Sequence, residues 1–391
     1  MKLRLLTVCV VLLIAACNSS GNKIAIEKND EIQINIPDNI DNSLLLHDDL
    51  FRVSNVVLVK PDSTHSESLI SDIASVKKIL QIDSIYVILD IKFRVVNAYN
   101  LKGQYLFTFN KLGVNKGGSS FPLDIVYDPQ KRHIFIVSNT PNKLMEYSIE
   151  GHLIKEYPFP FFPSSMEIKS PNEYIFDVNF NFNSVSKTNN IIATDSTLEV
   201  QERFLTYADV GEVPSPLDQG GMFKPTDSSL YFIPAYSNSI LVYKNQGFSS
   251  AFNIHFSTSP ENELKEITQK NVNEMTHILL GHFFKNDSYI GINYVDKEKK
   301  DIYTTLYNYR NGKIYRSSFF NSNDVNNFWG YLFQSENKIL LLVNVNEFYK
   351  RIRKKSSASS TESNAYSKIA LELSSMQVDK NSAAIITLEI I

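Results

Sequence analysis

The 391-residue chain is long enough to bury a large core, and its 43% hydrophobic and 21% charged residues are typical of a globular protein. A formal net charge of −3 argues against a general nucleic-acid binder, so we expect no nucleic-acid partner. Length alone allows two domains, but repeat folds of this size are often single.

The N-terminus reads as an export signal. Lys2 and Arg4 precede an apolar run over residues 5–14, and the small residues Ala15 and Ala16 follow. A charged start, about ten apolar residues and small residues before a cleavage point are typical of a secretory signal. The run is too short for a membrane-spanning helix, which needs about 20 apolar residues.

The run Ile14-Ala15-Ala16-Cys17 resembles the lipobox of bacterial lipoproteins. The resemblance implies cleavage before Cys17 and a diacylglycerol on its sulfur, usually with a third acyl chain, and two or three chains anchor a protein stably. A plain secretory signal with a chance cysteine is the alternative. We therefore expect a lipoprotein signal peptide over residues 1–16 and a flexible polar tether over 17–30. The mature fold would then have no disulfide, because Cys9 is removed and Cys17 is modified.

The expected location is the bacterial cell envelope. Residues 18–23 lack the acidic cluster that marks surface export in some lipoproteins. We therefore expect a lipid anchor in the outer membrane, on its periplasmic face rather than on the cell surface.

Residues 31–391 are organised as repeated groups of strands. Residues 31–37 alternate apolar and polar side chains, which indicates a strand that pairs with a distant part of the chain. Six later places repeat a pattern of polar turn residues, an apolar strand, and then a second and often a third strand. The equivalent strands begin at Ile85, Ile134, Tyr174, Leu230, Tyr289 and Ile339.

The spacing of these strands predicts the fold class. Short strands rich in Ile, Val, Tyr and Phe recur at about 40 to 60 residues, which indicates an all-β, six-bladed β-propeller with two short helical insertions. A β-sandwich is the alternative. We place one helix from Ser259 to Gly281 and another over residues 362–376, with Ile369, Leu371 and Leu373 partly buried. Either 383–389 or 53–60 is expected to close the ring.

The first unit also resembles a known family. Asp83-Ser84-Ile85-Tyr86-Val87, the turn Leu101-Lys102-Gly103-Gln104-Tyr105 and residues 113–122 are similar to six-bladed β-propeller lipoproteins related to NHL-repeat proteins. The resemblance implies a fold and a location more than an activity. Such proteins often carry a Gly-Pro-Gly-Glu-like turn after the first blade. Residues 113–118 keep the glycines without the acid, so no role for that acid transfers.

Compact catalytic motifs are absent from the sequence. It has no Gly-x-Ser-x-Gly elbow, no phosphate loop and no calcium loop. His277 and His282 lie five residues apart and are expected to straddle a helix end, in a surface or capping role. NHL-type lyases gather histidines from several blades, and His133, His255 and His282 lie in different units. We expect no metal and no cofactor.

Aromatic and amide side chains give the most suggestive binding signal. Trp329, the sole tryptophan, lies near Asn326 and Asn327, so the three are our candidate ligand-binding residues. The aromatic run 157–163 is expected to pack between blades, with a contact loop as the alternative.

These features favour a monomeric, membrane-anchored binding module for a protein, peptide or glycan. The alternative is a metal-dependent lyase or hydrolase that uses residues at the propeller channel. Whether the chain is an enzyme stays open at this point, because propeller sites draw single residues from many blades.

Overall fold

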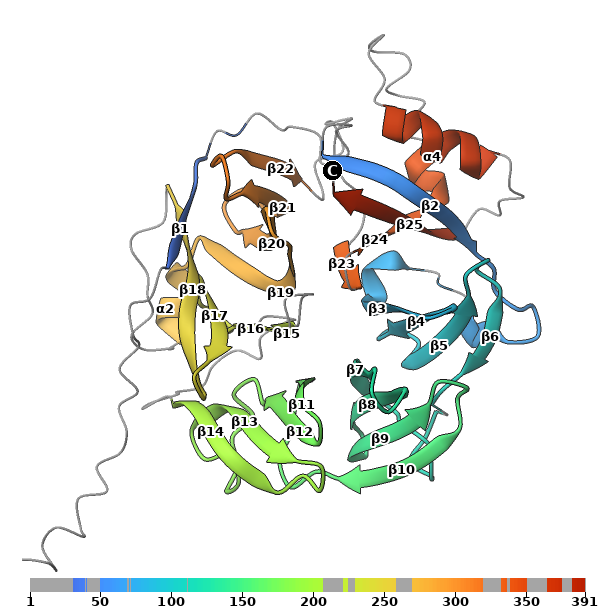
Figure 1. Ribbon diagram of the computed structural model, residues 1–391, viewed down its shortest axis with the longest axis vertical. Coiled ribbons are helices and arrows are strands. Elements are labelled where there is room, and N and C mark those ends of the chain that lie inside the picture. Colours follow the sequence, from blue (N-terminus) through green and yellow to red (C-terminus); the bar gives the residue numbers. More distant parts are fainter. Residues whose placement is uncertain are drawn as a thin grey trace, which may run out of the picture.

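The protein is an all-β, six-bladed β-propeller, as predicted (Figure 1). Six sheets stand around a common axis, five of them antiparallel and one with a single parallel pair, and the first strand of each blade lies innermost (Figure 1). The computed structural model describes residues 31–38, 40, 50–68, 70, 72–110, 112–206, 221–223, 229–257, 269–318, 332–335, 338–349, 364–374 and 382–390.

Blades 1 to 3 are four-stranded and follow one another in the chain. Blade 1 contains β3 (Val76–Ile82), β4 (Ile85–Asp90), β5 (Val95–Asn100) and β6 (Tyr105–Thr108). Blade 2 contains β7 (Pro122–Asp128), β8 (His133–Asn139), β9 (Asn142–Ser148) and β10 (Leu153–Pro158). Blade 3 contains β11 (Ser165–Ser170), β12 (Glu173–Asp177), β13 (Asn189–Asp195) and β14 (Val200–Thr206).

Blades 4 and 5 continue this order. Blade 4 contains β15 (Gly221–Phe223), β16 (Leu230–Ile233), β17 (Ser239–Lys244) and β18 (Gly247–Phe256). Blade 5 contains β19 (His277–Lys285), β20 (Tyr289–Asp296), β21 (Asp301–Asn308) and β22 (Ile314–Ser318). The six apolar strands used to count the repeats are the second strands of the six blades, so the predicted repeat is confirmed.

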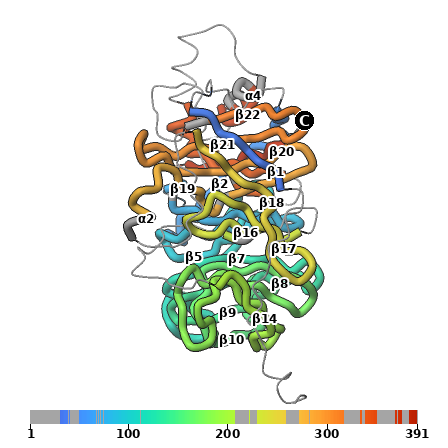
Figure 2. Tube along the Cα trace, turned by 90° about the vertical axis from the view of Figure 1, so that its left-hand side faces the viewer, coloured from blue at the N-terminus to red at the C-terminus, as the bar shows by residue number. Residues whose placement is uncertain are grey.

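Blade 6 closes the ring with both ends of the chain. It contains β23 (Leu332–Ser335), β24 (Lys338–Asn344), β25 (Ala383–Ile390) and β2 (Phe51–Val59). The two segments expected to compete for closure act together, because β2 pairs antiparallel with β25. The strand predicted over 31–37 is β1 (Ile32–Ile36), which pairs in parallel with β18 and adds a fifth strand to blade 4 (Figure 2).

The burial pattern explains why the second strands read as continuous apolar runs. All six residues of β4 are buried, because neighbouring blades cover both faces of the sheet. Ile85, Val87 and Leu89 pack against blade 2, whereas Tyr86 and Ile88 pack against blade 6. The outer strands β6 and β10 are mostly exposed or half-buried. A single blade therefore has no core of its own, and the ring stabilises all six together.

Turns between the outer strands use the glycines that the sequence placed there. Gly103, Gly151 and Gly312 have φ values of 76°, 87° and 73°, a conformation that side chains with a Cβ rarely adopt. In the first of these turns the Asn100 side chain accepts hydrogen bonds from the Lys102 and Gln104 amides at 2.9 and 3.0 Å.

The helices differ in part from the prediction. The described part of the first helix, α2 (Gln269–Glu274), ends early, and Ile278, Leu279 and Gly281 belong to β19. Pairing with β20 overrides an apolar spacing that also fits a helix. The second helix, α4 (Asn364–Ser374), is confirmed and packs against β2. Ile369 and Leu373 are fully buried on one face, but Leu371 faces the other way and is 73% exposed, so its expected burial is wrong.

The remaining helical elements are short: η1 (Ser66–Ser68), η2 (Ile73–Ser75) and a turn over residues 345–349. None of the described helices is both long enough and apolar enough to cross a membrane.

Candidate functional site at the central channel

Charged side chains from three consecutive blades meet at the innermost strands. Lys78 on β3 places its Nζ 3.1 Å from Asp124 Oδ1 on β7 and 3.5 Å from Glu167 Oε1 on β11. Each residue is the third of its strand, so the propeller rotation brings the three to one level around the axis. The Lys78 side chain keeps 24% of its exposure, whereas Asp124 and Glu167 keep 5% and 12%.

The backbone of two blades fixes the Asp124 carboxylate. Its Oδ1 accepts a hydrogen bond from the Ile125 amide at 2.8 Å, and its Oδ2 accepts one from the Met166 amide of blade 3 at 3.0 Å. Burial by itself lowers the pKa of Lys78, but the two carboxylates more than offset this and raise it above its usual value. Lys78 therefore stays charged, and Asp124 is rigidly placed.

A third acid lies in blade 3, at the end of β12 and opposite the start of β11. Asp177 ends β12, is 1% exposed, and accepts hydrogen bonds from the Asn179 amide at 2.8 Å and the Ser164 hydroxyl at 3.2 Å. Burial raises the pKa of Asp177 to about 7, although these hydrogen bonds and the nearby Lys77 lower it in part. Asp177 thus titrates near neutrality while it holds the segment that enters β11.

A similar acid recurs in other blades, which indicates a structural role. Asp90 and Asp296 also end second strands and accept hydrogen bonds from amides two or three residues later. The Ser75 hydroxyl before β3 donates to Asp90 at 2.9 Å, just as Ser164 donates to Asp177. These acids tie the end of the second strand to the start of the first.

The histidine side chains that the structure describes do not gather at the axis of the ring. His277, expected at the surface, is 5% exposed and stacks on Phe256, with 4.3 Å between the ring centroids. Its helical assignment fails because β19 begins there, and burial lowers its pKa despite Asp296 at 3.5 Å. His133 contacts Glu146 within blade 2 at 2.8 Å. In the described ranges, no three His, Cys, Asp or Glu side chains are grouped so that they could hold a metal ion.

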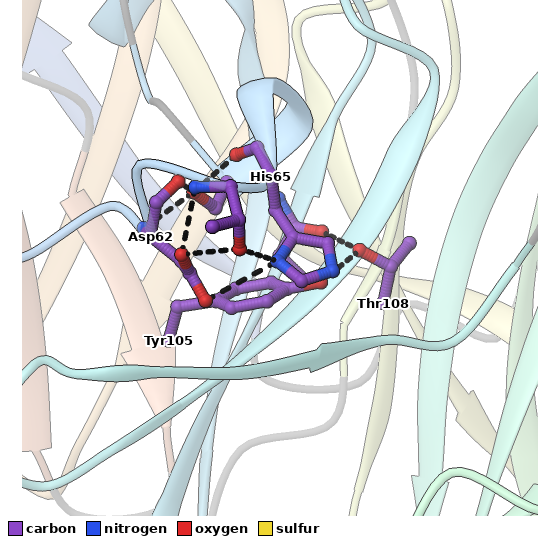
Figure 3. A network of polar contacts seen from close by, with 7 residues as sticks. Asp62, His65, Tyr105 and Thr108 are labelled. Carbon is purple, nitrogen blue, oxygen red and sulfur yellow. Dashed lines mark hydrogen bonds and ion pairs between the residues drawn. The ribbon is translucent and has the colours of Figure 1, made fainter.

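A separate polar network lies on the outside of blade 1 (Figure 3). His65 Nδ1 lies 3.2 Å from Asp62 Oδ2, and the His65 ring packs on Tyr105 with 5.3 Å between centroids. The Tyr105 hydroxyl lies 2.9 Å from Thr108 Oγ1, which donates to Asn97 at 2.6 Å. The network fastens the loop that enters β3 onto the outer strand β6, which gives it a structural role.

The residues predicted from the sequence as sites are not placed by the structure. Cys17, Asn326, Asn327 and Trp329 lie outside the described residues. The aromatic run 157–163 is described, and its expected packing role is found. Phe159 and Phe161 are buried between blades 2 and 3, while Phe162 is 46% exposed.

Sequence reasoning missed the inner strands and hence Lys78, Asp124 and Glu167. These strands mix apolar and charged residues and lack the continuous apolar run that marked their neighbours. A usable signal exists nonetheless. In each of blades 1 to 3, the polar turn before the second strand is preceded by a short apolar segment. That segment contains one or two charged residues.

The sequence of residues 31–387 matches the family described as a domain of unknown function, DUF4934. The chain belongs to the DUF4934 family. No curated protein matches its sequence.

Solved structures resemble this DUF4934 chain at low sequence identity. A Bacteroides fragilis protein assigned as exported has a TM-score of 0.71 at 12% identity, with 92% of this chain and 99% of that chain covered. A DUF4221 family member from Bacteroides vulgatus has a TM-score of 0.48 at 11% identity, over 88% and 99% of the chains. A streptogramin B lyase has a TM-score of 0.41 at 14% identity, over 75% and 80%. The first likeness shows a shared fold, and the scores of the other two are too low to carry an argument.

Proposed function

We propose that this DUF4934 chain is an exported, lipid-anchored propeller that binds a protein, peptide or glycan ligand at its central channel without catalysing a reaction. The observation that carries the proposal is the convergence of Lys78, Asp124 and Glu167 from three blades. A rigid ring that holds charged groups from distant parts of the sequence at one level is suited to recognising a polar ligand.

The energetics of the cluster support a role in binding. Desolvating an ion pair costs several kcal/mol per ion, and replacing a buried pair with apolar residues is often neutral or stabilising. Apolar packing at the axis would therefore stabilise the fold about as well as this ionic cluster does. The partly exposed Lys78 ammonium can donate to a ligand carbonyl, hydroxyl or carboxylate without moving its two partners.

The N-terminal sequence and one relative support export and anchoring. Residues 1–16 have the pattern of a signal, and Cys17 follows the lipobox-like run. A structural relative is assigned as exported. We place the anchor in the outer membrane, facing the periplasm. Intact-mass analysis and detergent partitioning of wild type and Cys17→Ser test this part, and a wild type without acyl mass that partitions into water would contradict it.

Binding is tested with the chain from residue 18, which keeps all six sheets because β1 begins at Ile32. Wild type, Lys78→Met and the matched surface variant Lys102→Met are screened on peptide and glycan arrays at equal folded concentration. We expect ligands that bind wild type and Lys102→Met alike but bind Lys78→Met at least about tenfold more weakly, since a charge-assisted hydrogen bond contributes about 1.5–3 kcal/mol. Ligands insensitive to Lys78→Met would exclude this site.

The enzyme alternative has its own measurement. Metal analysis of the purified protein, before and after dialysis, separates a binding module from a metal-dependent lyase or hydrolase. Stoichiometric metal retained through dialysis, with turnover of an array ligand lost on chelation, would overturn the non-catalytic assignment. Trp329, Asn326 and Asn327 stay candidate contact residues, and Trp329→Ala belongs in the same array experiment.

A further inference from the structure

Exposed apolar side chains are concentrated on one part of the ring. Eight large apolar side chains are exposed in the described part of the chain, and seven of them belong to residues 101–162. Four lie on the two loops that lead into the inner strands of blades 2 and 3: Leu112 (64% exposed), Val114 (66%), Phe121 (40%) and Phe162 (46%). We call these four residues the blade 2 rim. Clusters of exposed apolar residues mark contact surfaces more often than scattered ones do.

The two loops of the blade 2 rim flank one turn, so they lie on one face of the ring. The Ser120 amide donates to the Thr140 carbonyl at 2.7 Å on one side of the β8–β9 turn. On the other side the Asn142 side chain donates to the Phe161 carbonyl at 2.7 Å. Phe121 and Phe162 are thereby held on either side of residues 139–142.

Hydrogen bonds hold the longer loop in place, so the exposure of its apolar residues is a fixed feature. The Gly117 amide donates to Glu156 Oε1 at 2.8 Å, and the Tyr147 hydroxyl donates to the Gly117 carbonyl at 3.0 Å. Lys143 pairs with Glu156 and donates to the Asn115 carbonyl at 3.3 Å. This fixed loop presents Leu112 and Val114 to water.

The stretch of sequence that contains the blade 2 rim is basic. Residues 91–162 contain nine Lys or Arg and five Asp or Glu, a net formal charge of +4 in a chain whose total is −3. The segments 111–123, 139–145 and 157–166 contain no acid. Lys116 is exposed on the loop, and the Arg94 guanidinium lies 5.6 Å from the centroid of the Phe121 ring.

We propose that the blade 2 rim docks on an anionic lipid surface. Apolar side chains at the tip of a fixed loop can enter the boundary between head groups and acyl chains, while the basic side chains around them contact the anionic head groups. The inference rests on the proposed function only in that anchoring through Cys17 keeps a membrane within reach. Residues 18–31 can span at most about 50 Å when fully extended, which lets different faces of the domain approach the membrane.

The test uses the non-lipidated chain from residue 18 and vesicles of defined composition. Sedimentation is compared for vesicles of phosphatidylethanolamine and phosphatidylcholine alone and for the same mixture with 30% phosphatidylglycerol, at low and high salt. We expect binding to the anionic vesicles that high salt weakens. Because no acyl chain is present, failure here is distinguishable from failure of the lipid-anchor proposal, which mass analysis tests separately.

Matched variants assign the binding to the blade 2 rim. Leu112→Ser combined with Val114→Ser, and separately Lys116→Glu, should each weaken partitioning about tenfold. Leu371→Ser on α4 and Lys244→Glu at the β17–β18 turn change equally exposed residues elsewhere and should leave partitioning unchanged. No binding to anionic vesicles, or equal losses in the rim and control variants, would overturn the inference.

Discussion

Blades 1 to 3 and blades 4 to 6 are built on the same plan but are held together differently. In blades 1 to 3 the inner strands have six or seven residues and are joined by the charged cluster of Lys78, Asp124 and Glu167. In blades 4 and 6 the structure describes three residues of the inner strand β15 and four of the inner strand β23. These blades also take in distant strands, β1 in blade 4 and β2 in blade 6.

This difference assigns ring closure and ligand contact to different blades of one ring. Blade 6 depends on pairing between the two ends of the chain and blade 4 takes in β1, whereas blades 1, 2, 3 and 5 form from consecutive segments. Seven of the eight large apolar side chains that are exposed in the described part of the chain, together with the charged axial cluster, fall on blades 1 to 3 and the loops between them. The blades that take in the terminal strands are therefore distinct from the blades that carry the candidate contacts, and variants of each group should have different effects.

Removing β25 should have the largest effect. The strand lies between β24 and β2, so deleting residues 383–391 leaves β2 without a partner, leaves β24 paired with β23 alone, and opens the core of blade 6. We expect loss of cooperative unfolding, measured by circular dichroism and calorimetry.

The control is a chain that starts at residue 38 and lacks only the edge strand β1. It should still unfold cooperatively, at a lower Tm, because β18 keeps its pairing with β17. A β25 deletion that melts at the wild-type temperature would refute closure by the termini.

Gly103→Ala should destabilise the junction between blades 6 and 1. A Cβ at Gly103 would lie 2.0 Å from the Leu58 carbonyl oxygen of β2, and φ is +76°. We expect a loss of about 3 kcal/mol in the free energy of unfolding, from the clash and the unfavourable backbone conformation together. Gly247→Ala, which has no atom within 4 Å of its Cβ, should change it by less than about 1 kcal/mol. Equal effects in urea denaturation would contradict the assigned junction.

Lys78→Met should reduce stability less than Gly103→Ala. The variant leaves Asp124 and Glu167 without their shared ammonium, at a cost of about 2 kcal/mol that the partial exposure of the site moderates. Replacing all three residues together, as Lys78→Met, Asp124→Asn and Glu167→Gln, should recover part of that loss. Denaturant unfolding of both variants gives the values, and a triple variant less stable than Lys78→Met would show that the cluster is required for the fold.

The smallest effect expected is a pH dependence from Asp177. Its folded pKa, about 7, lies above the usual value of 3.8, so the native state holds a proton that the unfolded chain releases. This contribution is complete below about pH 4 and is lost as the pH rises through 7. Between pH 6 and pH 8 we expect a loss of about 1–2 kcal/mol in wild type. The loss should be absent in Asp177→Asn, and a variant with the wild-type pH profile would exclude Asp177 as its source.

The repeat of strands could be predicted from the sequence, but the charged residues at the axis of the ring could not. The second strands could be predicted because neighbouring blades cover both of their faces, which makes runs such as Ile85–Asp90 almost wholly apolar. The inner strands escaped prediction because they carry Lys78 and Asp124 among apolar residues and so lack a continuous apolar run. The partner of β25 also had to be seen in the structure, since pairing across more than 300 residues leaves no local pattern.

Two local predictions were wrong for similar reasons. The segment at His277 to Gly281 has an apolar spacing that fits either a helix or a strand, and pairing with β20 decided it. In α4 the spacing of Ile369 and Leu373 placed one buried face correctly, but Leu371, two residues from each, lies on the opposite face.

Hydrogen–deuterium exchange with an array-selected ligand tests most directly whether the ligand binds the inner strands of blades 1 to 3. We expect protection in peptides that cover β3, β7 and β11, centred on Lys78, Asp124 and Glu167, with little change in β15, β19 and β23. The protection should disappear in Lys78→Met and persist in Lys102→Met. Protection confined to blades 4 to 6, or to residues 319–331 around Trp329, would contradict a ligand site on the inner strands of blades 1 to 3.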